Sequence, residues 1–362
     1  MNILKPELLW IEQRCYRLND LITDVSALQE HDLYESDAPN NEFEEDDLDD
    51  VDCKIDQVDD SRFSTSIHVS KHYMGHIIGK RGCTIARISR DTKTDIKTPR
   101  PGQNKDITIM GQNVSSVKAA VRRINLVVMA SRVKQAYTHF VSIPMNSPDI
   151  VKNFESFKEN VLQQCPGIED SLFIKPGKLH ITVGVMCLMD NEERLMATKL
   201  LTDARDKYIM PMLQDYLPFN IRIKGLSYMN DDPKAINVLY GCIEEDGAPF
   251  GLMQKMVDAV YRHFNKAGLM NEKFYRDNVK MHVTLLNSKY RSQQKEIEES
   301  ETSSENTRAR KEPFDGSEIL SKFANYDFGV VEFNNIHLSQ RSTVGSDGYY
   351  QPSFVISCVS TN

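Results

Sequence analysis

A five-residue phrase occurs twice in this 362-residue sequence, about 100 residues apart. The two copies are Lys178-Leu179-His180-Ile181-Thr182 and Lys280-Met281-His282-Val283-Thr284. In a strand, alternation puts the lysine, histidine and threonine of each copy on one face and the aliphatic residues on the other. Two matched strands in similar β-α surroundings indicate an internal duplication. If the strands lie side by side, both histidines face one cleft.

The two phrases carry the side chains that phosphodiester cleavage requires. One imidazole can deprotonate the nucleophile and the other can protonate the leaving oxygen, because the ordinary imidazole pKa is about 6.5. The hydroxyls of Thr182 and Thr284 would donate to non-bridging phosphate oxygens, and the two lysines would support the charge if they point inward. The alternative, a histidine metal site, lacks a third ligand, so we expect neither a metal nor a cofactor.

Residues 137–360 resemble the 2H phosphoesterase family, which is related to the RNA 2',5'-ligase and cyclic phosphodiesterase group. The resemblance implies a duplicated, bilobal domain that acts as an RNA phosphodiesterase with an undefined substrate. The implied catalytic residues are His180, Thr182, His282 and Thr284, with Lys178 and Lys280 as phosphate support.

Other residues near these phrases have weaker interpretations. Asn287 matches an asparagine often found after the second motif of that family. A third phrase, His337-Leu338-Ser339, lacks the preceding lysine and is interpreted as a decoy in a late strand. Tyr349 and Tyr350 are interpreted as core or rim packing, with stacking on a base as the alternative.

The charge of the chain is divided unevenly. The formal charge of the whole chain is −8, which argues against a polyanionic partner. Residues 31–60, however, hold 14 acids against one lysine, for a net charge of −13. Residues 61–132 hold 14 bases against three acids, for a net charge of +11. The local charges therefore predict a nucleic-acid partner for the basic segment.

That basic segment contains a glycine loop between two predicted helices. Its sequence is Ile77-Ile78-Gly79-Lys80-Arg81-Gly82. Glycines let the backbone approach a phosphate-sugar chain, and two bases and a helix N-terminus add positive potential. The surrounding pattern predicts a strand at 64–69, helices at 71–78 and after 82, strands at 94–98 and 106–110, and a helix at 114–128.

This β-α-α-β-β-α order with an intact GxxG resembles a type I KH domain, over residues 61–133. KH loops clamp about four nucleotides of single strand. The resemblance implies that Gly79, Lys80, Arg81 and Gly82 bind RNA or DNA, with bases lying on a groove formed by Ile85, Ile88 and Ile96. The alternative is a KH fold kept for protein contacts only.

The second domain is predicted to be α+β as well. Its predicted strands are 137–143, 178–186, 220–228, 236–243, 279–286, 328–340 and 349–358, and its predicted helices are 147–164, 191–215, 249–267 and 316–324. Residues 291–312 are polar and charged, and we expect a mobile loop there.

The N-terminal part is not expected to form a domain. Residues 1–29 are predicted to be a short docking segment, or alternatively a linear motif for a partner protein, because so few residues cannot bury a core. Residues 30–60 are acidic and are predicted to be a disordered linker, either inert or competing with nucleic acid for the basic domain. Seven dispersed cysteines and no long apolar run indicate an intracellular protein with no membrane contact.

The order of the two domains, KH before 2H, resembles that of subunits of nuclear cointegrator complexes. Three segments carry the same resemblance: Leu4-Lys5-Pro6-Glu7-Leu8, Met229-Asn230-Asp231-Asp232-Pro233 and Phe314-Asp315-Gly316. This resemblance implies a nuclear location, partners in a helicase-containing complex, and links to transcription co-activation and alkylation-damage repair. Three functions remain open from the sequence: an RNA phosphodiesterase, a non-catalytic RNA-binding adaptor whose cleft only recognises phosphate, and a scaffold for partner proteins.

Overall fold

The computed structural model describes residues 8–11, 14–17, 53–59, 61–100, 103, 106–246, 249–270, 277–291 and 312–359. The chain divides into two compact units, residues 1–52 and 53–362. In the first unit, strands β1 (Leu8–Ile11) and β2 (Arg14–Arg17) form an antiparallel pair. The expected docking of this segment stays a prediction. The acidic run up to residue 52 and the expected mobile loop, apart from Arg291 and Glu312, lie outside the described residues.

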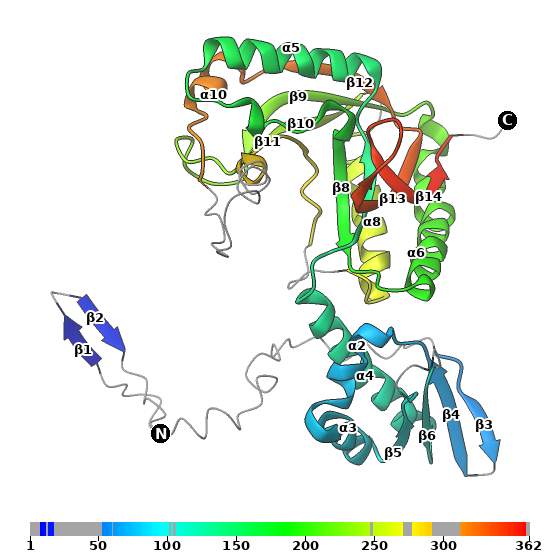
Figure 1. Cartoon of the computed structure of the whole chain (residues 1–362). Coiled ribbons are helices and arrows are strands. Elements are labelled where there is room, and N and C mark those ends of the chain that lie inside the picture. Colours follow the sequence, from blue (N-terminus) through cyan, green and yellow to red (C-terminus); the bar gives the residue numbers. More distant parts are fainter. Residues whose placement is uncertain are drawn as a thin grey trace. The chain divides into compact units, whose positions relative to one another are not determined.

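The N-terminal part of the second unit has the β-α-α-β-β-α order expected of a KH domain. Its elements are β4 (Arg62–Ile67), α2 (Lys71–Ile78), α3 (Cys83–Thr92), β5 (Thr94–Lys97), β6 (Ile107–Gly111) and α4 (Val114–Val133). The strands form an antiparallel sheet in the order β3-β4-β6-β5. Helix α4 packs on this sheet and contacts both α2 and α3 (Figure 1).

Strand β3 (Asp56–Asp59) corrects the prediction that the acidic linker is disordered up to residue 60. This strand is polar and mostly exposed, so nothing in its own sequence favours a strand. It forms because it pairs with β4, where Gln57 lies opposite Phe63. The hydroxyl of Thr65 also donates to the Lys54 carbonyl at 2.8 Å, which fixes the entry to the strand.

Helix α4 follows from the sequence pattern that predicts it. Its apolar positions recur at helical spacing and are buried against the sheet: Val117, Ala120, Val121, Ile124 and Val128. The side chain of Asn113 caps the helix by accepting from the Ser116 amide at 2.7 Å. The helix runs five residues beyond its predicted end, to Val133, and its last turn buries Ser131 and Arg132.

The C-terminal part of the unit is built on one antiparallel sheet of eight strands in the order β12-β9-β10-β11-β8-β7-β13-β14. The strands are β7 (His139–Pro144), β8 (His180–Met186), β9 (Asn220–Tyr228), β10 (Val238–Asp246), β11 (Val283–Asn287), β12 (Asp327–Glu332), β13 (Asn335–Val344) and β14 (Tyr350–Ser357). Strands β8 and β11 are the central pair, with three strands on either side. The duplicated layout predicted from the repeated phrase is therefore present.

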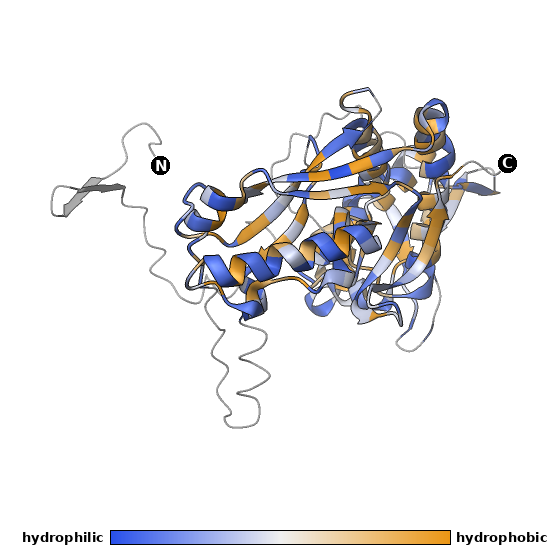
Figure 2. Ribbon diagram, turned by 90° about the horizontal axis from the view of Figure 1, so that it is seen from above, coloured by the Kyte–Doolittle hydropathy of each residue, from blue (hydrophilic) through white to orange (hydrophobic). Residues whose placement is uncertain are grey.

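The helices of this part connect equivalent strands in the two halves. Helix α5 (Pro148–Gln164) joins β7 to β8, and α8 (Leu252–Lys266) joins β10 to β11. Each crosses to the other half, since α5 packs on β12 and α8 packs on β8. Figure 2 shows apolar and polar positions alternating along these helices and strands. The apolar positions form one continuous core.

Two predicted elements are divided in the structure. The predicted helix at 191–215 is α6 (Asn191–Ala204), then a π-helical turn and the short α7 (Met210–Leu213). The predicted strand at 328–340 is split into β12 and β13, and α10 (Ser317–Phe323) precedes them. Within the described ranges, no helix has both the length and the apolar character needed to cross a membrane.

Candidate paired-histidine site and nucleic-acid interface

The two repeated phrases meet at the centre of the large sheet. Strands β8 and β11 are antiparallel, and Ile181 lies opposite Val283. Each is the middle residue of its His-x-Thr triplet, so the register is symmetric about this pair. Both side chains are fully buried in the core. The four remaining side chains, His180, Thr182, His282 and Thr284, therefore share the opposite face, which we call the paired-histidine face.

Both histidines of this face have the same hydrogen bond. Nδ1 of His180 lies 2.7 Å from the carbonyl oxygen of Lys178, and Nδ1 of His282 lies 2.7 Å from that of Lys280. A carbonyl oxygen can only accept, so each Nδ1 carries a proton and donates. In the neutral imidazole, Nε2 then presents a lone pair. The two rings are held in the tautomer that an acid-base pair needs.

The two lysines lie off the strands, which corrects the prediction that each whole phrase is a strand. Lys178 ends a 3-10 helix (Pro176–Lys178), and Lys280 precedes β11. Each lysine carbonyl accepts from the histidine two residues on instead of from a neighbouring strand. The Lys178 ammonium lies over the Tyr350 ring at 4.9 Å from its centroid, and the Lys280 ammonium lies over Tyr240 at 5.0 Å.

The same two tyrosines contact the histidines. Tyr350 packs edge-on against His180 and Tyr240 packs edge-on against His282, each with 5.3 Å between ring centroids. Tyr240 comes from β10, where it lies opposite Thr284. Sequence reasoning missed Tyr240, because this contact depends on the register between two strands. For Tyr350 the sequence favours packing, with stacking on a base as the alternative.

The surroundings of the two histidines differ. His180 is also packed against Phe140 at 5.2 Å and Tyr349 at 6.4 Å between ring centroids. Burial, together with the nearby His282 and Lys178, lowers the pKa of His180 to about 4, although its bond to the Lys178 carbonyl opposes this shift. His180 is therefore neutral at pH 7 and suited to accept a proton.

The third phrase lies on the same side of the sheet but further out. His337 lies opposite Ser142, and Ser142 lies opposite Thr182, so His337 is two strands away from Thr182. The ring of Tyr349 packs against His337 at 5.5 Å and against His180. Asn287, at the end of β11, accepts from the Lys289 amide at 3.0 Å, which is a turn contact. Among the described residues, no His, Cys, Asp or Glu side chains gather into a metal-binding group.

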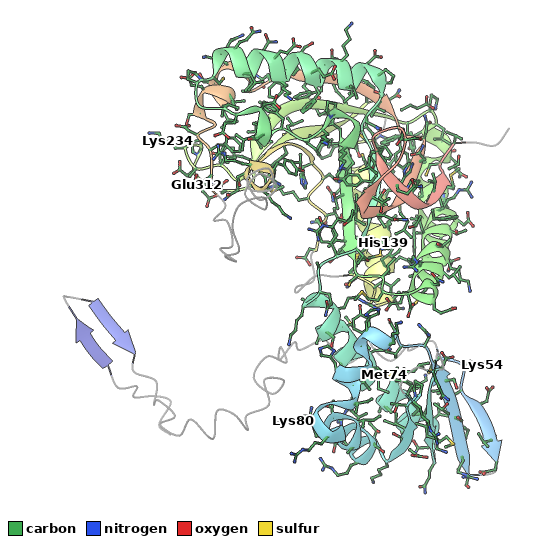
Figure 3. All side chains as sticks on the ribbon, in the orientation of Figure 1. Lys54, Met74, Lys80, His139, Lys234 and Glu312 are labelled. Atoms are coloured by element: carbon green, nitrogen blue, oxygen red, sulfur yellow. The ribbon has the colours of Figure 1, made fainter. Side chains whose placement is uncertain are left out.

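The glycine loop of the KH part has a conformation that requires its glycines. Gly79 has φ 73° and ψ 176°, a region that only glycine adopts readily. A Cβ on Gly79 would also lie within 3 Å of the backbone nitrogen of Thr84. Gly82 has φ 81°, and Arg81 between them has φ 54°. Lys80 and Arg81 are exposed, and Figure 3 labels Lys80 at this helix junction.

The three isoleucines predicted to line the base groove divide into two kinds. Ile85 on α3 and Ile96 on β5 are half-buried, so part of each side chain is open to a ligand. Ile88 is only 4% exposed. Its position on α3 faces the domain core, and we correct its predicted role from groove contact to core packing.

Comparisons with known proteins find similarity over two parts of the chain and over nearly its whole length. Residues 137–357 match the family described as AKAP7 2'5' RNA ligase-like domain, and residues 64–126 match the KH domain family. A mouse protein, activating signal cointegrator 1 complex subunit 1, is 30% identical over 359 residues, covering 97% of this chain and 98% of the mouse protein.

Two solved structures are similar to parts of the chain. The first type I KH domain of human Vigilin is 24% identical, with 22% of this chain and 87% of that chain covered and a TM-score of 0.20. The E. coli LigT crystal structure with NADP+ is 12% identical, with 62% of this chain and 98% of that chain covered and a TM-score of 0.34.

Proposed function

Because the chain belongs to the AKAP7 2'5' RNA ligase-like domain family and, over nearly its whole length, to the family of activating signal cointegrator 1 complex subunit 1, we propose that it is an RNA-binding phosphodiesterase. Its KH domain would hold a single strand of RNA, or of DNA, through the GxxG loop. The paired-histidine face would hydrolyse a phosphodiester or a 2',3'-cyclic phosphate end without a metal.

The observation that carries this proposal is the symmetric register of β8 and β11. It places two Nδ1-protonated imidazoles on one face, each with a threonine of the other triplet opposite it. A phosphate held between them would meet one nitrogen on the nucleophile side and one on the leaving-group side, which is the arrangement that general acid-base cleavage needs.

In the proposed hydrolysis, one histidine accepts a proton from water and the other donates a proton to the leaving oxygen. Nε2 of His180 takes a proton from the attacking water, whose oxygen forms a bond to phosphorus. The bond from phosphorus to the leaving oxygen breaks, and His282, carrying a second proton on Nε2, gives that proton to the leaving oxygen. The hydroxyls of Thr182 and Thr284 donate to the non-bridging oxygens, where negative charge develops. Exchange with solvent then returns both imidazoles to their starting states.

Single replacements of the two histidines test this proposal. We expect His180→Ala and His282→Ala each to lower the turnover of labelled single-stranded RNA by about a hundredfold or more, while RNA affinity stays within about twofold. Turnover that survives in the double variant would show that the two histidines are not the catalytic groups. Intact RNA binding without turnover by the wild type would favour the second function, a non-catalytic adaptor that recognises phosphate.

The cellular setting is proposed from the family. The name of the mouse relative assigns it to a cointegrator complex, and we extend this to the present chain as a complex subunit. Following the resemblance described above, we place it in the nucleus, in a helicase-containing assembly linked to transcription co-activation and alkylation-damage repair. Affinity purification after nuclease treatment tests this: co-purification of a helicase supports it, and isolation of the chain alone from nuclear extract contradicts it.

A further inference from the structure

The two halves of the paired-histidine face differ in how much aromatic surface they expose. Tyr240, beside His282, is only 6% exposed and so offers little surface to a ligand. Tyr350, beside His180, is half-buried and therefore reaches the surface. It is also packed edge-on against Phe140 at 4.9 Å and Tyr349 at 5.6 Å between ring centroids. The His180 side thus carries an accessible aromatic surface that the His282 side lacks.

A second aromatic group extends this surface. The Arg341 guanidinium lies over the Tyr137 ring at 4.2 Å and donates to the Tyr137 carbonyl at 3.3 Å. Both residues are half-buried, as is Tyr290. Arg341 lies on β13, where its amide donates to the Thr138 carbonyl at 2.9 Å, and the same strand pairs with β14, which begins at Tyr350. Tyrosines and a stacked arginine are the groups that hold unpaired bases.

The backbone that carries Tyr350 is firmly fixed. The hydroxyl of the neighbouring Tyr349 donates to Ser142 at 2.9 Å, and Ser142 lies 2.9 Å from Ser339. Ser142 and Ser339 are fully buried, and Tyr349 is 2% exposed. In addition, the backbone of Gly348 approaches so closely that a Cβ on Gly177 would lie 3.2 Å from its carbonyl oxygen. Tyr350 is therefore held beside the Lys178 turn before any ligand arrives.

We propose that Tyr350, with the stacked Tyr137 and Arg341, forms a nucleobase subsite on the His180 side of the scissile phosphate. The proposal rests on the function proposed for the paired-histidine face and adds a substrate requirement. The substrate carries an unpaired base on the His180 side, and no base is stacked on the His282 side. Stacking tolerates all four bases, so the subsite requires a base without selecting its identity.

The lysine that covers Tyr350 fits this role. Lys178 lies over the ring in the absence of a ligand, and burial lowers its pKa, so its ammonium is already partly stripped of water. A base that stacks on Tyr350 would displace the Lys178 ammonium from the ring. The displaced ammonium would then be free to contact the phosphate beside His180. Base binding and phosphate support would then occur together.

A fluorescent dinucleotide tests the subsite. The probe is a ribodinucleotide with 2-aminopurine as one base, in both orders, compared with the same dinucleotide lacking a base at one position or the other. All measurements use the full chain with Lys80→Ala and Arg81→Ala, so that the KH loop contributes little to binding. We expect quenching of 2-aminopurine in one of the two orders, and about tenfold weaker binding when that base is absent.

Variants of Tyr350 show where the base binds. Tyr350→Leu should abolish the quenching and bind the complete and base-lacking dinucleotides equally, whereas Tyr350→Phe, which keeps the ring, should behave like the parent. Equal affinity of the parent for the complete and base-lacking dinucleotides overturns the subsite, as does unchanged quenching in Tyr350→Leu. The parent comparison decides the matter even if Tyr350→Leu fails to fold. Chromatography of the same samples reports cleavage, so absent turnover counts against the proposed hydrolysis and not against the subsite.

Discussion

The hydroxyl of Tyr73 donates a hydrogen bond to the carbonyl oxygen of Cys187 at 3.3 Å. Tyr73 lies on α2, the helix that ends next to Gly79 of the GxxG loop. Cys187 follows β8, the strand that begins at His180. One buried hydrogen bond therefore joins the element before the candidate RNA loop to the strand that carries a candidate catalytic histidine. The KH and phosphoesterase-like parts share a packed interface and are not joined by a linker alone.

Replacing Tyr73 by phenylalanine tests the contribution of this bond. Tyr73 is fully buried, so Tyr73→Phe leaves the Cys187 carbonyl without that donor and should lower the free energy of unfolding by about 1 kcal/mol. Urea unfolding followed by circular dichroism measures the loss. Tyr216→Phe is the matched control. Tyr216 is 39% exposed, so removing its hydroxyl should have no measurable effect on the free energy of unfolding. Equal midpoints for the two variants would contradict the account.

The same interface contains a buried ion pair. Arg132 on α4 contacts Glu193 on α6 at 2.5 Å, with both side chains under 10% exposed, and its guanidinium lies 5.5 Å from the Tyr73 ring centroid. Glu193→Gln leaves a buried, uncompensated positive charge and should cost about 3 kcal/mol or more in unfolding free energy.

An exposed pair provides the comparison for this prediction. Asp203 and Lys207 lie one turn apart on the surface, 3.7 Å from each other, with 52% and 60% of their side chains exposed. Asp203→Asn should change the unfolding free energy by less than about 0.5 kcal/mol. If thermal or urea unfolding shows similar losses for Glu193→Gln and Asp203→Asn, the interface is not a stabilising element.

His68 makes the stability of the interface depend on pH. Its Nε2 lies 3.0 Å from Asp190 and its Nδ1 lies 3.4 Å from Asp106. Burial alone would lower the pKa of His68, but the two carboxylates outweigh burial and raise it. The protonated form is therefore favoured in the folded state. Its contribution is full below pH 6.5, the unfolded-state value, and is lost as the pH rises through the higher folded-state pKa.

The comparison of wild type with His68→Gln between pH 6 and pH 9 checks this sign. We expect the wild type to be the more stable protein at pH 6 and the difference to shrink as the pH rises. A difference that stays constant, or that grows toward pH 9, would contradict the assigned contacts. Unfolding free energies at each pH provide the measurement.

Replacing Gly79 or Gly75 by alanine should change the stability of the protein in opposite directions. Gly79→Ala places a methyl group against the Thr84 backbone and forces a φ/ψ region that only glycine adopts readily, so we expect a loss of about 2 kcal/mol or more and weaker RNA binding. Gly75, in the middle of α2, has open space around it and ordinary helical geometry. Gly75→Ala should therefore stabilise the protein by about 0.5–1 kcal/mol. Similar losses in both variants would argue that the loop conformation is not strained in this way.

The sequence predicts most of the fold because its signals are local. The order of KH elements follows from glycine positions and apolar spacing, and the central pair of strands follows from the repeated phrase. Strand β3 could not be predicted, because its polar residues form a strand only by pairing with β4. The sequence also could not show that Ile88 is buried in the core whereas Ile85, on the same helix, is half-exposed.

The candidate site is predicted only in part for the same reason. The two histidines share one phrase, so their common face follows from alternation. Tyr240 reaches His282 only through the register of β10 on β11, which shifts by a bulge between Leu239 and Tyr240. The unequal surroundings of the histidines likewise depend on Phe140, Tyr349 and Tyr350, which come from strands or turns outside the repeated phrases.

The central claim is that His180 acts as a neutral base on the same face as His282, and the pH dependence of RNA turnover tests it most directly. Turnover of single-stranded RNA by the full chain is measured from pH 3.5 to pH 8 with a metal chelator present. Because burial lowers the pKa of His180 to about 4, we predict that turnover falls on the acid side near pH 4 and is unchanged by the chelator. An acid limb near pH 6.5, or turnover that stops when the chelator is added, would contradict the account.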